Sequence, residues 1–211
     1  MIFYASALSS YSAKVRLVLC VKSVPFEERE PPGGYRSAEY RAIVPMGTLP
    51  AIQEGDWVLS ESEAINEYLE ERYPQPPMLP QDLRERAKVR FISRFHDLHL
   101  EPKVRALFPH ARPAKRDEAV VSALHAEISQ RIERLDGMCE PQPWLLTPRI
   151  SLADCGLLVS IPLAQQILKA CGQPLALPKR LSVWLENSAS DAAVERALAP
   201  WRKATNTWLE A

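Results

Sequence analysis

The sequence has no excess of positive charge. Its 211 residues include 26 basic and 26 acidic side chains, which leaves a formal net charge of +0. Binding to nucleic acid or to an anionic membrane depends on a surplus of Lys and Arg, and this chain offers none. We therefore expect neither as a partner, and a small molecule or another protein fits the composition better.

Long apolar runs are also missing. Residues 1–5 are apolar, but they carry no basic leader and are far shorter than the roughly 20 apolar residues of a membrane-spanning helix. These features predict a cytoplasmic protein without a signal peptide or a membrane span.

Cysteine is scarce, and no two cysteines have the C-x-x-C spacing. The four are Cys20, Cys139, Cys155 and Cys171, three of them within apolar helical patterns. Without paired spacing no zinc site is predicted, and buried, reduced thiols are the expected state. Cys20 lies in the middle of a predicted helix and not at a helix start, so we do not expect it to be catalytic.

Proline, by contrast, is concentrated in one segment. Residues 74–80 contain four prolines, which cannot continue a helix and form a stiff, extended connector. We predict a first domain over residues 1–74, a linker over 75–82 and a second domain over 83–211.

The patterns before the connector predict an α/β domain. Short β-prone segments at 1–4 and 26–30 flank an apolar helix over 12–22, and such a unit implies parallel strands. The remaining elements are a helix, two strands joined by a Gly55 turn, and a second helix, over residues 37–43, 49–53, 57–60 and 61–73.

The patterns after the connector predict only helices. Apolar residues recur at spacings of three and four over residues 83–105, 117–135 and 151–170. The last of these is apolar nearly all round, which is typical of the central helix of a bundle. Ser151, followed three residues later by Asp154, is a candidate helix-capping pair with a structural role.

Leu49 and Pro50 begin a predicted strand. Pro50 has no N–H group, so the two residues belong at a sheet edge or a turn, and the bond between them is a candidate cis bond. Such backbone can pair with a peptide. Glu61 and Ser62 begin the next helix, where free N–H groups and the helix dipole hold a small anion. A peptide-like ligand with a carboxylate fits both places.

Hydroxyl groups gather at the start of the first predicted helix, at Ser9, Ser10 and Ser12. A hydroxyl and the free N–H groups at a helix start can together stabilise a thiolate. Plain helix capping by serine is the alternative interpretation. Tyr4 and Tyr11 are further hydroxyl donors, although Tyr4 belongs to a predicted strand and to the core.

These motifs and their order resemble the glutathione transferase family over the whole chain. The resemblance implies a thioredoxin-like N-terminal domain, a helical-bundle C-terminal domain and glutathione as cosubstrate. In that family the residue before a cis-proline pairs with the cysteinyl part of glutathione, and a Glu/Gln-Ser pair holds its γ-glutamyl end. The matching residues here are Leu49, Pro50, Glu61 and Ser62.

The serine cluster is similar to the signature of the zeta class. In that class the first serine activates the thiol, which points to Ser9, with Ser10 as the next candidate and Ser12 as an alternative helix cap. The class has Cys at the third position of the signature, where this chain has Tyr11. A cysteine-assisted step is therefore not implied.

Arg94, His96 and His99 share one predicted helix. The two histidines are three residues apart, whereas paired metal-binding histidines on a helix are usually four apart, and we predict no metal site. The resemblance instead places this helix beside the second-substrate pocket. All three residues are therefore candidates for contact with the second substrate.

The resemblance implies an enzyme of detoxification that couples glutathione to a small electrophile. A maleylacetoacetate-type isomerase is the second enzymatic interpretation, but the family's carboxylate-binding Arg, about twelve residues after the capping Asp154, is matched here by Gln166. A non-catalytic interaction module is the alternative outside enzymes. The family also implies a homodimer, in which the basic 83–105 helix could pair with the acidic 61–72 helix of a second copy.

Overall fold

The computed structural model describes residues 1–210, and contacts group the chain into two units. The first unit comprises Met1–Met78 with Ala192–Ala204, and the second comprises Leu79–Asp191 with the last residues from Thr205. The division after Met78 falls within the predicted linker, and the domain boundaries stay a prediction. No helix within residues 1–210 has the length and apolar character that crossing a membrane would need.

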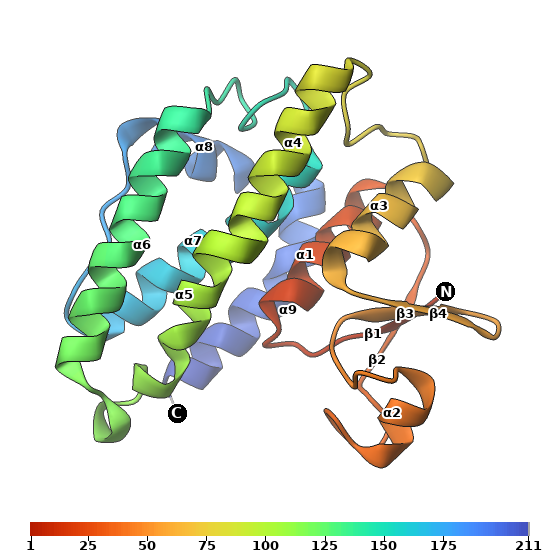
Figure 1. The fold of residues 1–211 in the computed structure, drawn as a ribbon, viewed down its shortest axis with the longest axis horizontal. Coiled ribbons are helices and arrows are strands. Elements are labelled where there is room, and N and C mark those ends of the chain that lie inside the picture. The colour runs from red at the N-terminus through yellow and green to blue at the C-terminus, as the bar shows by residue number, and fades with distance from the viewer. Residues whose placement is uncertain (211) are drawn as a thin grey trace. The chain divides into compact units, whose positions relative to one another are not determined.

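Four short strands form the sheet of the first unit (Figure 1). They are β1 (Ile2–Tyr4), β2 (Glu27–Arg29), β3 (Ala51–Glu54) and β4 (Trp57–Ser60), in the order β2-β1-β3-β4. β1 and β2 are parallel because a helical crossover joins them, whereas β3 and β4 form an antiparallel hairpin. Gly55, with φ of 59°, supplies the positive φ of the hairpin turn. The predicted parallel pair and hairpin are confirmed.

Three helices accompany the sheet: α1 (Ser10–Val21), α2 (Ala38–Ile43) and α3 (Ser62–Arg72). α1 is buried along almost its whole length, although it carries Lys14 and Arg16 and is followed by Lys22. A buried charge is costly unless it is paired. Each of these cations meets a carboxylate, in the pairs Lys14–Glu63, Arg16–Glu28 and Lys22–Glu70.

Two of these ion pairs fix how α1 and α3 run. Lys14 lies near the start of α1 and pairs with Glu63 in the first turn of α3, whereas Lys22 caps the end of α1 and pairs with Glu70 near the end of α3. Start meets start and end meets end, so the two helices are parallel and their N-termini lie at the same end of the pair.

Lys22 also holds the proline-rich segment. Its ammonium donates to the carbonyls of Tyr73 and Pro76, at 2.7 and 3.0 Å, and Glu70 accepts from the N–H of Met78. The beginning of the predicted linker is therefore bound to the first unit.

The start of the C-terminal helix, α9 (Ala192–Glu210), belongs to the first unit as well. Arg196 donates to the carbonyl of Cys20 at the end of α1, at 2.9 Å. Nearby apolar residues of α9, among them Leu198 and Trp201, are buried. The sequence predicted a helical character for this segment but gave no sign of where it packs.

The second unit is helical, as predicted. Its main helices are α4 (Leu83–Phe95), α5 (Glu101–Ala106), α6 (Glu118–Met138), α7 (Leu152–Ala170) and α8 (Lys179–Ser188). Short 3₁₀ turns, Phe108–His110 and Pro113–Lys115, lie between α5 and α6. α7 is buried on nearly all sides and packs against α4 and α5, which confirms it as the central helix of this unit.

The predicted single α-helix over 83–105 is wrong in one respect. A π-helical segment, His96–Leu100, separates α4 from α5, and the N–H of Glu101 bonds to the carbonyl of His96, five residues back. Pro102 provides the reason, because it has no N–H to donate to the carbonyl of Leu98 and its ring crowds the preceding turn.

Asp154 holds three parts of the second unit together. Its side chain is fully buried and accepts from the backbone N–H and the hydroxyl of Ser151, the N–H of Leu145 and the indole N–H of Trp184, at 2.8–3.0 Å. Burial raises the pKa of this carboxyl, and the four donors act against that rise. The capping pair predicted at the start of α7 is confirmed, and it also binds the preceding loop and α8.

We expect Asp154→Ala to lower the free energy of unfolding by at least about 3 kcal/mol, because it leaves several buried donors without an acceptor. Urea unfolding followed by circular dichroism measures the loss. The matched control is Asp136→Ala, which removes the partly exposed pair with Arg180 and should cost less than about 1 kcal/mol. Equal losses in the two variants would contradict this account.

Candidate functional site

Ser9 begins α1 and caps it. Its backbone is extended, with φ of −76° and ψ of 116°, and its hydroxyl oxygen accepts from the N–H of Ser12 at 3.1 Å. The hydroxyl proton can still be donated, because capping uses only the oxygen as an acceptor. Ser9 therefore combines the two interpretations of the sequence, helix cap and hydroxyl donor. The alternative that Ser12 caps this helix is wrong.

The other hydroxyls of this region are less accessible. Ser10 and Ser12 are buried, and Ser12 accepts from the N–H of Ser6 at 3.5 Å. Tyr4 is a core residue, as predicted, and its hydroxyl donates to the side-chain carbonyl of Gln53 at 2.8 Å. Ser9, which is half-buried, and Tyr11 are the more exposed donors at this helix start.

Leu49 and Pro50 form a cis peptide bond in the loop that enters β3. β3 pairs with β1 on one side and β4 on the other, so the expected sheet edge is wrong, and the two residues lie at a bend in the loop. The ladder begins at Ala51, which leaves Leu49 outside it. The loop is fixed by Tyr40, whose buried hydroxyl donates to the carbonyl of Thr48 at 2.9 Å and whose pKa is raised by that burial.

Glu61 and Ser62 form the junction between β4 and α3. Glu61 has φ of 76° and ψ of 113°, a region that non-glycine residues rarely occupy, and its side chain makes no capping bond. The first N–H groups of α3 have no partner within the helix, and such groups, together with the positive end of the helix dipole, are able to bind an anion. A strained residue before an uncapped helix start is a typical feature of a ligand site.

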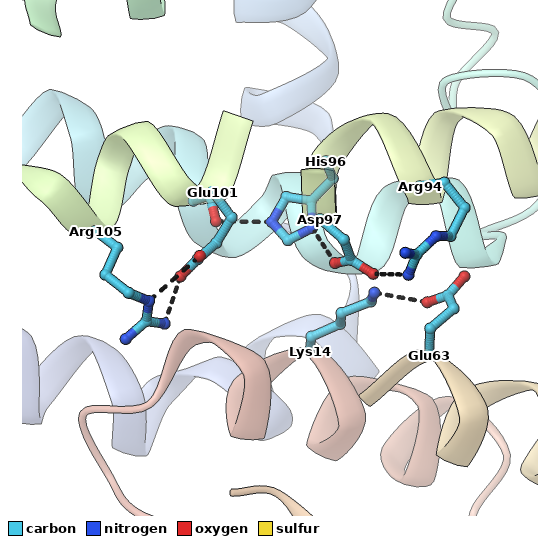
Figure 2. A network of polar contacts seen from close by, with 8 residues as sticks. Lys14, Glu63, Arg94, His96, Asp97, Glu101 and Arg105 are labelled. Atoms are coloured by element: carbon cyan, nitrogen blue, oxygen red, sulfur yellow. Dashed lines mark hydrogen bonds and ion pairs between the residues drawn. The ribbon is translucent and has the colours of Figure 1, made fainter. Parts of the chain in front are cut away.

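The two helix starts lie at the same end of the parallel pair α1 and α3. Figure 2 shows the Lys14 and Glu63 side chains pointing towards each other, with 2.6 Å between Nζ and Oε2. The candidate site of the first unit therefore has a hydroxyl at the start of α1 and a helix start without a side-chain cap on α3.

The three residues predicted to contact a second substrate differ in exposure. Arg94 and His99 are exposed, and Arg94 pairs with Asp97 at 3.1 Å. His96 is 2% exposed, and one ring nitrogen lies 2.8 Å from Asp97 Oδ1 (Figure 2). The other ring nitrogen lies 2.8 Å from Ser160 Oγ. Burial of His96 does not favour contact with a substrate.

Asp97, His96 and Ser160 have the residue types and order of contacts of a hydrolase triad, but Ser160 is fully buried inside α7. No substrate reaches a nucleophile in such a place. The cluster instead joins the π-helical segment to α7. Gly156 permits this approach, because a Cβ at that position would lie 2.4 Å from His96 Nδ1.

The cysteines take no part in the site. All four are buried, and none forms a disulfide within residues 1–210. Burial raises the pKa of the Cys139 thiol to about 12 and raises that of Cys171 as well. These two thiols are protonated at neutral pH and unreactive. Within residues 1–210 no group of three or more His, Cys, Asp or Glu side chains is placed to hold a metal ion.

Comparison with known proteins gives the class of the chain. A family model described as "Glutathione S-transferase, N-terminal domain" matches residues 3–77. Glutathione S-transferase Z1 of Arabidopsis thaliana is 40% identical over 87 residues, which are 40% of this chain and 39% of that protein. The matches to the first curated relatives span about two fifths of their length.

A longer match covers most of the chain. Maleylacetoacetate isomerase of Pseudomonas aeruginosa is 31% identical over 175 residues, which are 77% of this chain and 80% of that protein. The solved holo structure of a maleyl pyruvate isomerase, a bacterial zeta-class glutathione S-transferase, has a TM-score of 0.76 at 26% identity and covers 93% of this chain and 96% of its own. The chain belongs to the glutathione S-transferase family.

Replacing Glu61 by glycine should relieve the strain of its backbone. Glu61→Gly should raise the free energy of unfolding by about 1 kcal/mol, because glycine adopts positive φ without strain, and should at the same time weaken glutathione binding. Calorimetry and urea unfolding measure the two effects. Ser23→Gly is the matched control, since Ser23 has φ of 53° away from both helix starts, and it should leave the affinity unchanged. A Glu61→Gly protein that is less stable than the parent would contradict the strain.

Proposed function

We propose that this protein is a glutathione transferase that uses the Ser9 hydroxyl to stabilise the glutathione thiolate. Leu49, before Pro50, offers backbone groups to the cysteinyl part, and Glu61 and Ser62 with the start of α3 bind the γ-glutamyl end. The observation that carries the proposal is the meeting of the Ser9 hydroxyl and the uncapped start of α3 at one end of a parallel helix pair.

The free energy needed to ionise the glutathione thiol agrees with a role for the Ser9 hydroxyl. A free thiol has a pKa of about 8.5, and lowering it by about two units takes roughly 2.7 kcal/mol. A hydrogen bond to a charged group contributes about 1.5–3 kcal/mol, and the positive end of α1 adds to it. One serine hydroxyl at a helix start is therefore sufficient.

The second substrate is proposed to be a small electrophile, and detoxification in the cytoplasm is the proposed role. Four free thiols fit a reducing compartment. Arg94 and His99, which are exposed, are better candidates than the buried His96 for contact with that substrate.

Isomerisation of a maleyl compound is the second candidate reaction, favoured by the similarity to maleylacetoacetate isomerase. Against it stands the absence of a guanidinium at Gln166, because an amide binds a carboxylate more weakly than the two-pronged group of Arg. A spectrophotometric screen of aryl halides, isothiocyanates, peroxides and maleyl compounds distinguishes the two reactions.

Ser9→Ala should lower kcat by about 10- to 100-fold with little change in the Kd of glutathione, because the hydroxyl acts on the thiolate and not on the rest of the peptide. Steady-state kinetics and calorimetry measure the two quantities. Ser10→Ala is the control and should keep most of the activity. The reverse result would move the role to Ser10, and full activity of both variants would contradict the serine mechanism.

A wild-type protein that passes unretained through a glutathione column would favour the non-catalytic interaction module.

A homodimer is the proposed assembly. The sequence suggests pairing of the acidic 61–72 helix with the basic 83–105 helix, and we now base the assembly instead on exposed apolar residues. Glu63 and Glu70 of the acidic helix are bound by lysines of their own unit, so fewer acidic side chains remain for a second copy. α4 and the π-helical segment after it instead expose three large apolar residues, Leu83, Phe91 and Leu98, at 77%, 55% and 58%. Exposed apolar residues that recur over two consecutive helical segments fit an interface between copies.

We expect sedimentation at micromolar concentration to give a dimer, and Phe91→Glu to shift it to monomer, because the substitution places a charge in the apolar contact. Val183→Glu on α8, where Val183 is 45% exposed, is the matched control and should remain dimeric. A monomeric wild-type protein, or a dimeric Phe91→Glu, would contradict this assembly.

A further inference from the structure

Lys14 lies where a lysine is costly. Its side chain is 0% exposed, in the second turn of α1, one helical turn after Ser10. Full burial keeps the ammonium away from any ligand, so Lys14 can influence the site only through the groups that it holds.

One group that Lys14 holds is the carboxylate of Glu63, next to Ser62. Glu63 lies in the first turn of α3 with a side chain that is 14% exposed, and its Oε2 is 2.6 Å from Lys14 Nζ. Within residues 1–210, neither carboxylate oxygen of Glu63 has a hydrogen-bond partner beyond this ion pair. Glu63 therefore depends on Lys14, and their pairing joins α1 near Ser9 to α3 beside Glu61 and Ser62.

A second pair joins the same helices at their other ends. Lys22 and Glu70 are also 2.6 Å apart, but they hold the backbone of Tyr73, Pro76 and Met78 in addition. The two pairs are alike in chemistry and burial and differ in place. One lies at the helix starts that form the site, and the other lies at the proline-rich segment.

We infer that Lys14 and Glu63 are positioning residues, which fix the distance between the start of α1 and the start of α3 so that one glutathione molecule reaches both. The inference rests on the proposed function. The thiolate is held by Ser9 and the γ-glutamyl end by α3, so a change in the distance between these helix starts weakens one contact whenever the other is made. The ion pair sets that distance with two buried charges, whose separation is far less adjustable than an apolar contact.

The test compares two double variants. Lys14→Met with Glu63→Met replaces the site pair by apolar side chains of similar length, and Lys22→Met with Glu70→Met does the same to the distant pair. We expect the first variant to raise the KM for glutathione, and its Kd by calorimetry, about tenfold while kcat at saturating glutathione changes less than threefold. The second variant should leave KM and Kd within twofold of the parent.

The KM-against-kcat split separates positioning from loss of structure. A merely structural pair, when removed, lowers the fraction of folded protein, which lowers the apparent kcat without changing KM. The control variant should destabilise the fold at least as much as the site variant, because Lys22→Met with Glu70→Met also removes the partners of three backbone groups. If the site double variant does not fold, Glu63→Gln takes its place, since the amide keeps the shape of Glu63 and weakens only the attraction, and KM should rise about threefold.

Two outcomes overturn this inference and leave the proposed function intact. One is a KM within twofold of the parent in the site variant, and the other is an equal rise of KM in both double variants, while the wild-type protein binds glutathione. A wild-type protein that does not bind glutathione overturns the proposed function, and this inference with it.

Discussion

Burial of positive charge on α1 is the constraint on which the first unit depends. A helix that packs on all sides is normally apolar, yet α1 and its C-cap carry Lys14, Arg16 and Lys22. Because each buried cation needs a carboxylate, β2 and α3 must present Glu28, Glu63 and Glu70 at fixed places. The charge pairs thus decide the direction of α3 and the place of its start relative to α1.

The same constraint explains why the site is made of helix starts. Parallel packing of α1 and α3 brings two positive dipole ends together, and a negatively charged ligand at the candidate site would relieve their repulsion. One of these starts is capped by Ser9 and the other follows the strained residue Glu61. Both therefore keep polar groups that a peptide-like anion can use.

Much of the fold and of the candidate site follows from local patterns in the sequence. The hairpin around Gly55 and the capping residue Asp154 each depend on neighbours a few positions away, and the structure has both where the patterns predict them. The first helix, predicted over residues 12–22, begins two residues earlier, at Ser10. The interruption at His96 was missed, although Pro102 carried the signal, because a proline in an apolar pattern can also kink a helix or end it.

By itself, the sequence determined which main elements form, in what order, and that a cluster of hydroxyls precedes the first helix and a Glu-Ser pair begins α3. Periodicity and turn chemistry act over short distances, and that is enough for these features. Only the tertiary structure decided which carboxylate meets Lys14, that His96 is buried against Gly156, and that Arg196 bonds to Cys20, 176 positions away. The physical reason is that a charged residue in a helical pattern looks identical in the sequence whether its side chain is exposed to water or is buried and paired with a distant carboxylate.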